Sequence, residues 1–225
     1  MPWRFVEGIS LDTDEAIKEY SKAYNFLFYK RCLTAGEIAV YLGHRRIWEA
    51  FLKSGDDYAL VLEDDFQIID QVALKASIKD AVTHPGRWDM VKFFDAQRKR
   101  PVASLMLGTS RFVCAKYPPF GTVAYLINVE TARTLLARQR IYRPIDEDHC
   151  RPWEFPLRVW SSEPPFIVEN SIGLGGSMLT EGREKIERLR GKNLFRRIIM
   201  RNLQELSKSL AAKRYQRMMQ NSVEM

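Results

Sequence analysis

The first 170 residues alternate between short apolar runs and longer stretches in which apolar residues recur every three or four positions. Residues 58–62 (YALVL) form an unbroken apolar run, which is typical of a strand buried on both faces. Residues 88–94 form a second strand-like run after the turn residues 84–86, and the pattern between the two runs predicts a helix over 71–83. This alternation of strand and helix predicts a layered α/β sheet.

A capping box marks the start of the clearest predicted helix. Thr34 and Glu37 have the spacing at which a threonine hydroxyl and a glutamate three residues later satisfy each other's free backbone amides. We expect this helix to end before the polar turn residues 53–57. The residues on its core-facing side are expected to be Ile38, Tyr41, Leu42, Trp48, Phe51 and Leu52. Further strands are expected over 3–9, 111–117, 122–128 and 166–168, and further helices over 12–28 and 130–139.

The last part of the chain has a different pattern. Residues 171–177 (SIGLGGS) predict a flexible link, so we divide the chain into a globular domain over 1–176 and a helical tail over 177–225. Beyond the link, apolar residues recur at steps of four, four, three and four, which predicts an amphipathic helix with cations on another face. The apolar stripe consists of Phe195, Ile199, Leu203, Leu206 and Leu210.

The formal charge of +7 is concentrated in this tail. Residues 183–217 contain 12 lysines and arginines and 3 glutamates, and this excess of 9 is larger than the net charge of the whole chain. A basic amphipathic helix can lie on an anionic membrane surface, cover an apolar face of the body, or pair with another subunit in a homodimer. We expect no specific binding to nucleic acid, because Phe195 and Tyr215 are too sparse for a stacking platform.

The cysteines and the hydropathy pattern predict a protein of a reducing compartment. Cys32, Cys114 and Cys150 are too few and too widely spaced for a disulfide framework or a paired zinc motif. No segment approaches the roughly 20 apolar residues that span a bilayer, and the first ten residues lack the pattern of an export leader. We therefore expect a cytoplasmic protein.

The acidic run Glu63-Asp64-Asp65 is the strongest candidate for chemistry. It directly follows the predicted buried strand 58–62, and open α/β sheets bind their ligands outside the carboxyl ends of their strands. Adjacent carboxylates repel one another unless a cation or proton lies between them, and such oxygen ligands suit Mg²⁺ or Mn²⁺ carrying a diphosphate. A solvated acidic turn is the alternative interpretation.

The order and spacing of several motifs resemble those of a known enzyme family. Residues 36–38 (GEI), 42–44 (LGH), 47–48 (IW) and 58–65 (YALVLEDD) together resemble the opening signature of family 25 glycosyltransferases, which includes bacterial lipopolysaccharide and lipooligosaccharide sugar transferases. The resemblance extends over roughly Trp3 to Val168, with further matching blocks at 121–128, at 144–148 and at Trp153.

This resemblance implies a GT-A-like nucleotide-binding fold. It also implies transfer of galactose, or a related hexose, from a UDP-sugar to a lipid-linked lipooligosaccharide or lipopolysaccharide glycan. Glu63, Asp64 and Asp65 would then take the place of the family's DxD-type metal site, with Mn²⁺ or Mg²⁺ neutralising the charge that builds on the leaving diphosphate.

An inverting transfer also needs a base for the acceptor hydroxyl, and the resemblance makes Asp146 and Asp148 the candidates. A helix-start aspartate is the alternative for each, and Glu147 lies between them. His44 and Gly121 match family positions beside the donor. His44 could instead be a core histidine, and Gly121, with Tyr125, is expected to shape the pocket wall.

One departure from the family pattern favours a second hypothesis. Members usually begin with a strand and helix that help hold the nucleotide, whereas residues 3–8 of this chain resemble the second strand of that arrangement. The chain could therefore be a truncated or non-catalytic relative that acts as a membrane-associated partner in glycan assembly. For either function we expect a peripheral location on the inner face of a bacterial inner membrane.

Overall fold

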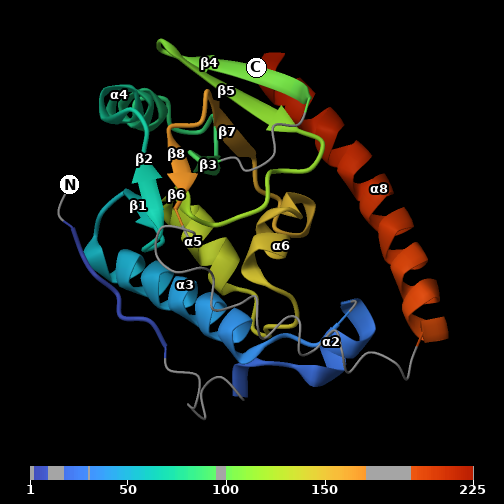
Figure 1. Ribbon diagram of the computed structural model, residues 1–225. Coiled ribbons are helices and arrows are strands. Elements are labelled where there is room, and N and C mark those ends of the chain that lie inside the picture. The colour runs from blue at the N-terminus through green and yellow to red at the C-terminus, as the bar shows by residue number, and fades with distance from the viewer. Residues whose placement is uncertain (1–2, 10–17, 30, 95–99, 171–193, 225) are drawn as a thin grey trace.

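The computed structural model describes residues 3–9, 18–29, 31–94, 100–170 and 194–224 (Figure 1). The expected link over 171–177 and the boundary between residues 176 and 177 lie outside the described residues. The first part of the expected helix 12–28 also lies outside them.

A mixed sheet forms the centre of the fold. Its strand order is β1-β6-β3-β7-β5-β4, in which β3 and β7 run parallel and the other neighbouring pairs run antiparallel. A separate two-stranded sheet pairs β2 with β8. The strands are β1 (Tyr58–Leu62), β2 (Phe66–Ile68), β3 (Met90–Lys92), β4 (Pro101–Leu107), β5 (Ser110–Ala115), β6 (Ala124–Asn128), β7 (Val159–Glu163) and β8 (Ile167–Glu169).

Helices cover both faces of the main sheet, so the predicted α/β class is confirmed and the architecture is consistent with a GT-A-like fold. In β6, Tyr125 and Ile127 face one apolar core, whereas Ala124 and Leu126 face the other. The first core lies under α3 (Ala35–Ser54) and α5 (Val129–Leu136), and the second under α4 (Gln71–Val82) and α8 (Leu194–Glu224). The shorter helices are α2 (Lys22–Phe28), α6 (Ile145–His149) and the 3-10 turn η1 (Pro152–Glu154).

Helix α3 begins as the capping box predicts. The Thr34 hydroxyl accepts a hydrogen bond from the Glu37 amide, and the Glu37 carboxylate accepts one from the Thr34 amide, both at 3.0 Å. Arg31 adds a forked contact to the same carboxylate at 2.5 and 2.6 Å. The helix ends at Gly55, whose φ of 77° is the left-handed conformation that favours glycine.

Two of the predicted elements are wrong in part, and both errors concern the N-terminal region. Residues 3–9 form no strand, because none of the strands that the structure describes pairs with them. The expected helix 12–28 is interrupted before α2, where Tyr20 forms a β-bridge with Ile141 and Ser21 caps the new helix. A local pattern identifies neither event, because the bridge at Tyr20 depends on Ile141, far along the chain, and strand formation at residues 3–9 would need a partner strand that the described residues do not supply.

The sequence pattern predicts only one strand of the hairpin formed by β4 and β5. Only residues 111–117 were expected as a strand, whereas β4 pairs with β5 through a turn that contains Gly108 at a φ of 55°. The predicted strand 88–94 is shorter, as β3, and the predicted helix 130–139 ends at Leu136.

The distal end of α8 packs on the body. Ala212, Tyr215 and Met219 are buried, and the Tyr215 hydroxyl accepts a hydrogen bond of 3.0 Å from the Val159 amide in β7. Leu206 and Leu210 of the predicted apolar stripe are instead 65% and 64% exposed. Figure 1 shows this long helix running along one side of the molecule. Three alternatives were open for the tail: a membrane surface, an apolar face of the body and a second subunit. This end of the helix covers an apolar face of the body.

We predict that Met219→Ala will destabilise the protein by about 2–4 kcal/mol, because a fully buried methionine leaves a cavity. Met218→Ala is the matched control, since Met218 is 39% exposed on the same turn of α8 and should cost less than about 1 kcal/mol. Urea unfolding followed by tryptophan fluorescence measures both. Equal losses in the two variants would show that α8 does not dock through this face.

Candidate active site

The three carboxylates of the acidic run point to different surroundings. The Glu63 amide continues the pairing of β1 with β6 by donating to the Val123 carbonyl at 2.9 Å. Asp64 and Asp65 then form the turn into β2, where Asp64 is exposed and Asp65 is half-buried. The side chain of Asp64 is therefore directed to solvent, and that of Asp65 is partly buried.

Glu63 belongs to a buried polar network. One of its carboxylate oxygens, Oε1, accepts a hydrogen bond from the Thr122 hydroxyl and lies 3.1 Å from His44 Nε2. Burial would raise the pKa of Glu63, but the hydrogen bond and attraction from His44, the Thr122 hydroxyl and the Lys92 charge outweigh it and lower the pKa. Glu63 is therefore a stable anion that fixes the end of β1.

His44 connects Glu63 to the core of α3 and β6. Its Nδ1 lies 2.7 Å from the Tyr125 hydroxyl, which accepts a hydrogen bond of 2.9 Å from Trp48 Nε1. The donors are consistent when the Tyr125 hydroxyl donates to Nδ1 and His44 Nε2 donates to Glu63. His44 is buried, so the structure gives it the positioning role that a core histidine would have.

Two further titratable groups lie beneath this network. Lys92 is buried, and its ammonium donates to the Pro119 carbonyl. His149 is buried against the rings of Trp48 and Tyr125, and neither ring nitrogen has a hydrogen-bond partner among the described residues. Burial lowers the pKa of His149 well below its usual value, and the nearby Lys92 charge and His44 lower it further. His149 is therefore neutral at neutral pH.

Asp65 carries the feature that points to a ligand. Its Oδ1 atom is buried and has no hydrogen-bond partner among the described residues. Burial raises the pKa of Asp65, and so do the nearby carboxylates of Glu63, Glu169 and Asp64. A buried acceptor in a field of negative charge is stabilised by a cation.

The residues present fit a divalent ion only in part. The described residues contain no group of three or more histidine, cysteine, aspartate or glutamate side chains arranged to hold a metal. Mg²⁺ in nucleotide sites commonly takes one or two carboxylates and completes its shell with phosphate oxygens and water. Asp65, with the exposed Asp64 beside it, suits a site of this kind, whereas Glu63 Oε1 already accepts from Thr122 and His44.

Gly121 sets the position of Thr122. Its φ is 92°, and a Cβ added there would lie 2.5 Å from Cε1 of the buried Phe94 ring. Glycine therefore lets the loop before β6 approach Phe94 closely, which brings the Thr122 hydroxyl to Glu63. Gly121, which the sequence predicts to shape the pocket wall, therefore affects the acidic run by positioning Thr122 against Glu63.

The two candidate bases of α6 occupy different environments. Asp148 is buried, accepts a hydrogen bond of 2.6 Å from the Tyr41 hydroxyl, and lies 2.8 Å from Arg143 Nε and 3.3 Å from Arg138 Nε. Both of its oxygens are engaged, so this placement suits a structural ion pair better than a base. Asp146 is partly exposed, and its Oδ1 accepts from the Glu147 amide at 2.8 Å.

Several residues of the network were not predicted as site residues. Thr122 and His149 carry no spacing signal of their own. Lys92 could have been noticed as a cation inside the strand-like run Met90-Val91-Lys92-Phe93-Phe94. Trp153 could either stack on a sugar ring or pack in the protein. In the structure it makes edge contacts with the rings of Tyr117 and Tyr215.

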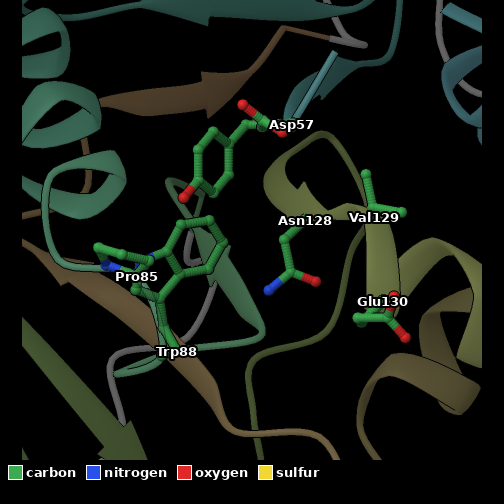
Figure 2. A pocket seen from close by; sticks show the side chains of 8 residues that line it. Asp57, Pro85, Trp88, Asn128, Val129 and Glu130 are labelled. Carbon is green, nitrogen blue, oxygen red and sulfur yellow. The ribbon is translucent and has the colours of Figure 1, made fainter. Parts of the chain in front are cut away.

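A pocket of about 180 Å³ lies at the opposite end of β1 from the acidic run (Figure 2). It is lined by Asp57, Tyr58, Pro85, Gly86, Trp88, Asn128, Val129 and Glu130. The Trp88 side chain is buried, and the Asn128 side chain caps α5 by accepting from the Thr131 amide at 2.8 Å. Both residues therefore have structural roles, and the pocket contains none of the predicted site residues.

Comparison with known proteins gives one family. The family described as glycosyltransferase family 25 (LPS biosynthesis protein) matches residues 1–150. A "Glycosyltransferase 25 family member" of Aedes aegypti is 30% identical over 148 residues, which cover 63% of this chain and 24% of that protein. The corresponding protein of Anopheles gambiae is 29% identical over 155 residues, which cover 64% of this chain and 26% of that protein.

Relatives named as inactive also match. The human "Inactive glycosyltransferase 25 family member 3" is 32% identical over 121 residues, which cover 52% of this chain and 20% of that protein. The chain thus spans about a quarter or less of the length of these relatives.

We predict that Gly121→Ala will cost about 2–4 kcal/mol of unfolding free energy, because it combines a positive φ with overlap against Phe94. Gly55→Ala is the matched control, since Gly55 has a φ of 77° with no atom near the added Cβ, and should cost only about 1–2 kcal/mol. Urea titrations of both variants measure the difference. The contact with Phe94 would be unimportant if the two losses were the same.

We also predict a pH dependence of stability from His149. Its folded pKa lies below the ordinary value of 6.5, so below that pH the unfolded chain binds a proton that the folded chain does not. The contribution is fully present above pH 6.5 and falls as the pH decreases, with a slope of about 1.4 kcal/mol per pH unit.

His149→Phe should remove this slope while keeping an aromatic ring between Trp48 and Tyr125. His84→Gln, at the exposed turn after α4, should leave the slope in place. Urea unfolding between about pH 5 and pH 7.5 measures it. An unchanged slope in His149→Phe would rule out this histidine as its source.

Proposed function

Because the chain belongs to glycosyltransferase family 25, we propose that it transfers a hexose, galactose in the first instance, from a UDP-sugar to a lipooligosaccharide or lipopolysaccharide glycan. The observation that carries the proposal is Asp65 Oδ1, a buried carboxylate oxygen in the turn after β1 for which the described residues supply no hydrogen-bond partner. It lies where a cation and a diphosphate would relieve the repulsion among neighbouring carboxylates.

In this proposal Asp65 and Asp64 hold the divalent ion, Mn²⁺ or Mg²⁺. When bound, the ion would neutralise charge on the leaving diphosphate. Glu63 fixes the turn that carries the two aspartates, through its contacts with Thr122 and His44. The orientation of Asp65 therefore depends on the buried network behind it.

The proposed transfer inverts the anomeric carbon. The acceptor hydroxyl oxygen forms a bond to that carbon, the bond from the carbon to the diphosphate breaks, and the hydroxyl proton passes to a carboxylate. We propose Asp146 for this proton, because Asp146 is partly exposed whereas Asp148 is buried between Arg138 and Arg143.

A non-catalytic role in glycan assembly is the second candidate function. It is favoured by the similarity to relatives named as inactive, among them the human protein at 32% identity. The two functions differ in one measurable property, which is metal-dependent binding of the donor nucleotide.

The proposed acceptor is lipid-linked, so we propose that the protein works on the inner face of a bacterial inner membrane. The exposed Leu206 and Leu210, with the exposed cations Lys213, Arg214 and Arg217, support contact between α8 and an anionic surface. No helix among the described residues is long and apolar enough to cross a bilayer. A homodimer through the same face and the absence of specific nucleic-acid binding stay predictions.

We predict that UDP will bind the protein in the presence of Mn²⁺, and that Asp65→Asn will weaken this binding about 10- to 100-fold because the ion loses a charged ligand. The variant should fold at least as stably as the wild type, since it removes a carboxylate held among other carboxylates. Isothermal titration calorimetry with and without Mn²⁺ measures the binding.

Asp57→Asn is the matched control, because Asp57 is an exposed aspartate at the other end of β1 and should bind UDP as the wild type does. If the folded wild type binds no UDP with Mn²⁺, the enzymatic proposal fails and the non-catalytic function takes its place. If Asp65→Asn binds normally, the metal site lies elsewhere.

A further inference from the structure

Helix α2 has its polar and apolar residues in the reverse of the usual arrangement. Asn25 is the buried residue of the helix, and its side-chain amide donates to the carbonyls of Arg31 at 2.9 Å and Tyr142 at 2.8 Å. The exposed residues include Tyr24, Phe26, Leu27 and Phe28, at 50%, 55%, 52% and 50% exposure. A helix on the surface of a soluble protein normally turns its apolar face inward, so this apolar surface requires an explanation.

The exposed rings are held in a fixed arrangement. The centroids of Tyr24 and Phe28 lie 5.7 Å apart, and each lies 6.0 Å from the ring of Tyr142. The guanidinium of Arg138 stacks on Tyr142 with a distance of 4.8 Å to the ring centroid. We call Tyr24, Phe26, Leu27 and Phe28 the α2 patch. With half of each side chain exposed, the patch presents on the order of 400 Å² of mostly apolar surface.

Among the described residues, Lys18, Lys22 and Arg140 are exposed cations beside the patch. Lys22 belongs to α2 itself, and Lys18 and Arg140 are joined by a hydrogen bond of 2.8 Å from Arg140 Nη1 to the Lys18 carbonyl. The nearby Glu19 carboxylate is neutralised by Arg45 at 2.8 Å. Apolar and aromatic side chains rimmed by lysine and arginine match the interface of an anionic bilayer, where rings enter the headgroup region and cations contact phosphates.

We propose that the α2 patch docks onto an anionic lipid surface, with Tyr24, Leu27 and Phe28 entering the headgroup layer and Lys18 and Lys22 contacting lipid phosphates. This surface is separate from the tail contact proposed above and does not depend on sugar transfer. Figure 1 shows α2 at the periphery beside α6, and the hydrogen bond of 3.2 Å from the Tyr29 hydroxyl to Glu147 joins the two elements.

Vesicle co-sedimentation tests the proposal with the full chain, vesicles of phosphatidylcholine alone and vesicles that also contain phosphatidylglycerol. The wild type should sediment with the anionic vesicles, and Leu27→Ser/Phe28→Ser should lower the partition coefficient about tenfold or more. Ile69→Ser/Val72→Ser is the matched control, since Ile69 and Val72 are exposed apolar residues at the start of α4 and should have no effect.

A second variant keeps the test valid if the serine variant folds poorly. Lys18→Gln/Lys22→Gln alters only exposed side chains and should weaken sedimentation with anionic vesicles while circular dichroism stays unchanged. A wild type that sediments with neither vesicle overturns the proposal.

Two other results would also overturn it. In one, only Leu206→Ser/Leu210→Ser loses vesicle binding, which would assign the membrane contact to α8 alone. In the other, the wild type is a dimer in analytical ultracentrifugation and Leu27→Ser/Phe28→Ser is a monomer, which would make a second copy the occupant of the patch. Neither result bears on UDP binding, so failure here and failure of the proposed function are distinguishable.

Discussion

A chain of buried hydrogen bonds from Trp48 through Tyr125 and His44 to Glu63 joins α3 and β6 to the end of β1. Trp48, Tyr125 and His44 are buried and Glu63 is partly buried, so their polar atoms need partners inside the protein. A fully satisfied polar network of this kind is stabilising and specifies one arrangement, whereas a partly satisfied one is costly. The position of the acidic turn thus follows from how α3 packs on the sheet.

This constraint divides the acidic run between two tasks. Glu63 is turned inward, where His44, Thr122 and the charge of Lys92 stabilise its anion and lower its pKa. Asp65 gains no comparable partners, and its pKa is raised by burial and by the carboxylates around it. The same contrast recurs in α6, where Asp148 is held by two arginines and Asp146 is partly exposed. In each pair, one carboxylate is held by several charged or polar partners, and the other is the residue to which the proposed function assigns chemistry.

Sequence patterns predicted the elements whose causes are local. Thr34 and Glu37 satisfy each other within one turn of helix, and the apolar run 58–62 forms a strand that leads directly into the acidic turn. Patterns failed where the cause is distant, as at Tyr20, which pairs with Ile141, and at residues 3–9, which have no partner strand among the described residues. For the site, spacing indicated where the carboxylates cluster, but the environment of Glu63 depends on Thr122, Lys92 and His44, which come from a loop, a strand and a helix elsewhere in the sequence.

This division changes what an intact acidic signature means for a family in which some members are named as inactive. Replacement of Glu63 would leave His44 and Thr122 without their acceptor. Replacement of Asp148 would remove the acceptor of the buried Tyr41 hydroxyl and one of the two carboxylates that Arg138 and Arg143 share, the other being Glu154. Both residues are therefore needed by the fold whether or not the protein transfers a sugar. Asp65 has no such structural duty, because its buried oxygen lacks a partner among the described residues. The buried oxygen of Asp65, rather than the acidic run as a whole, is therefore the observation on which the proposed transferase function rests.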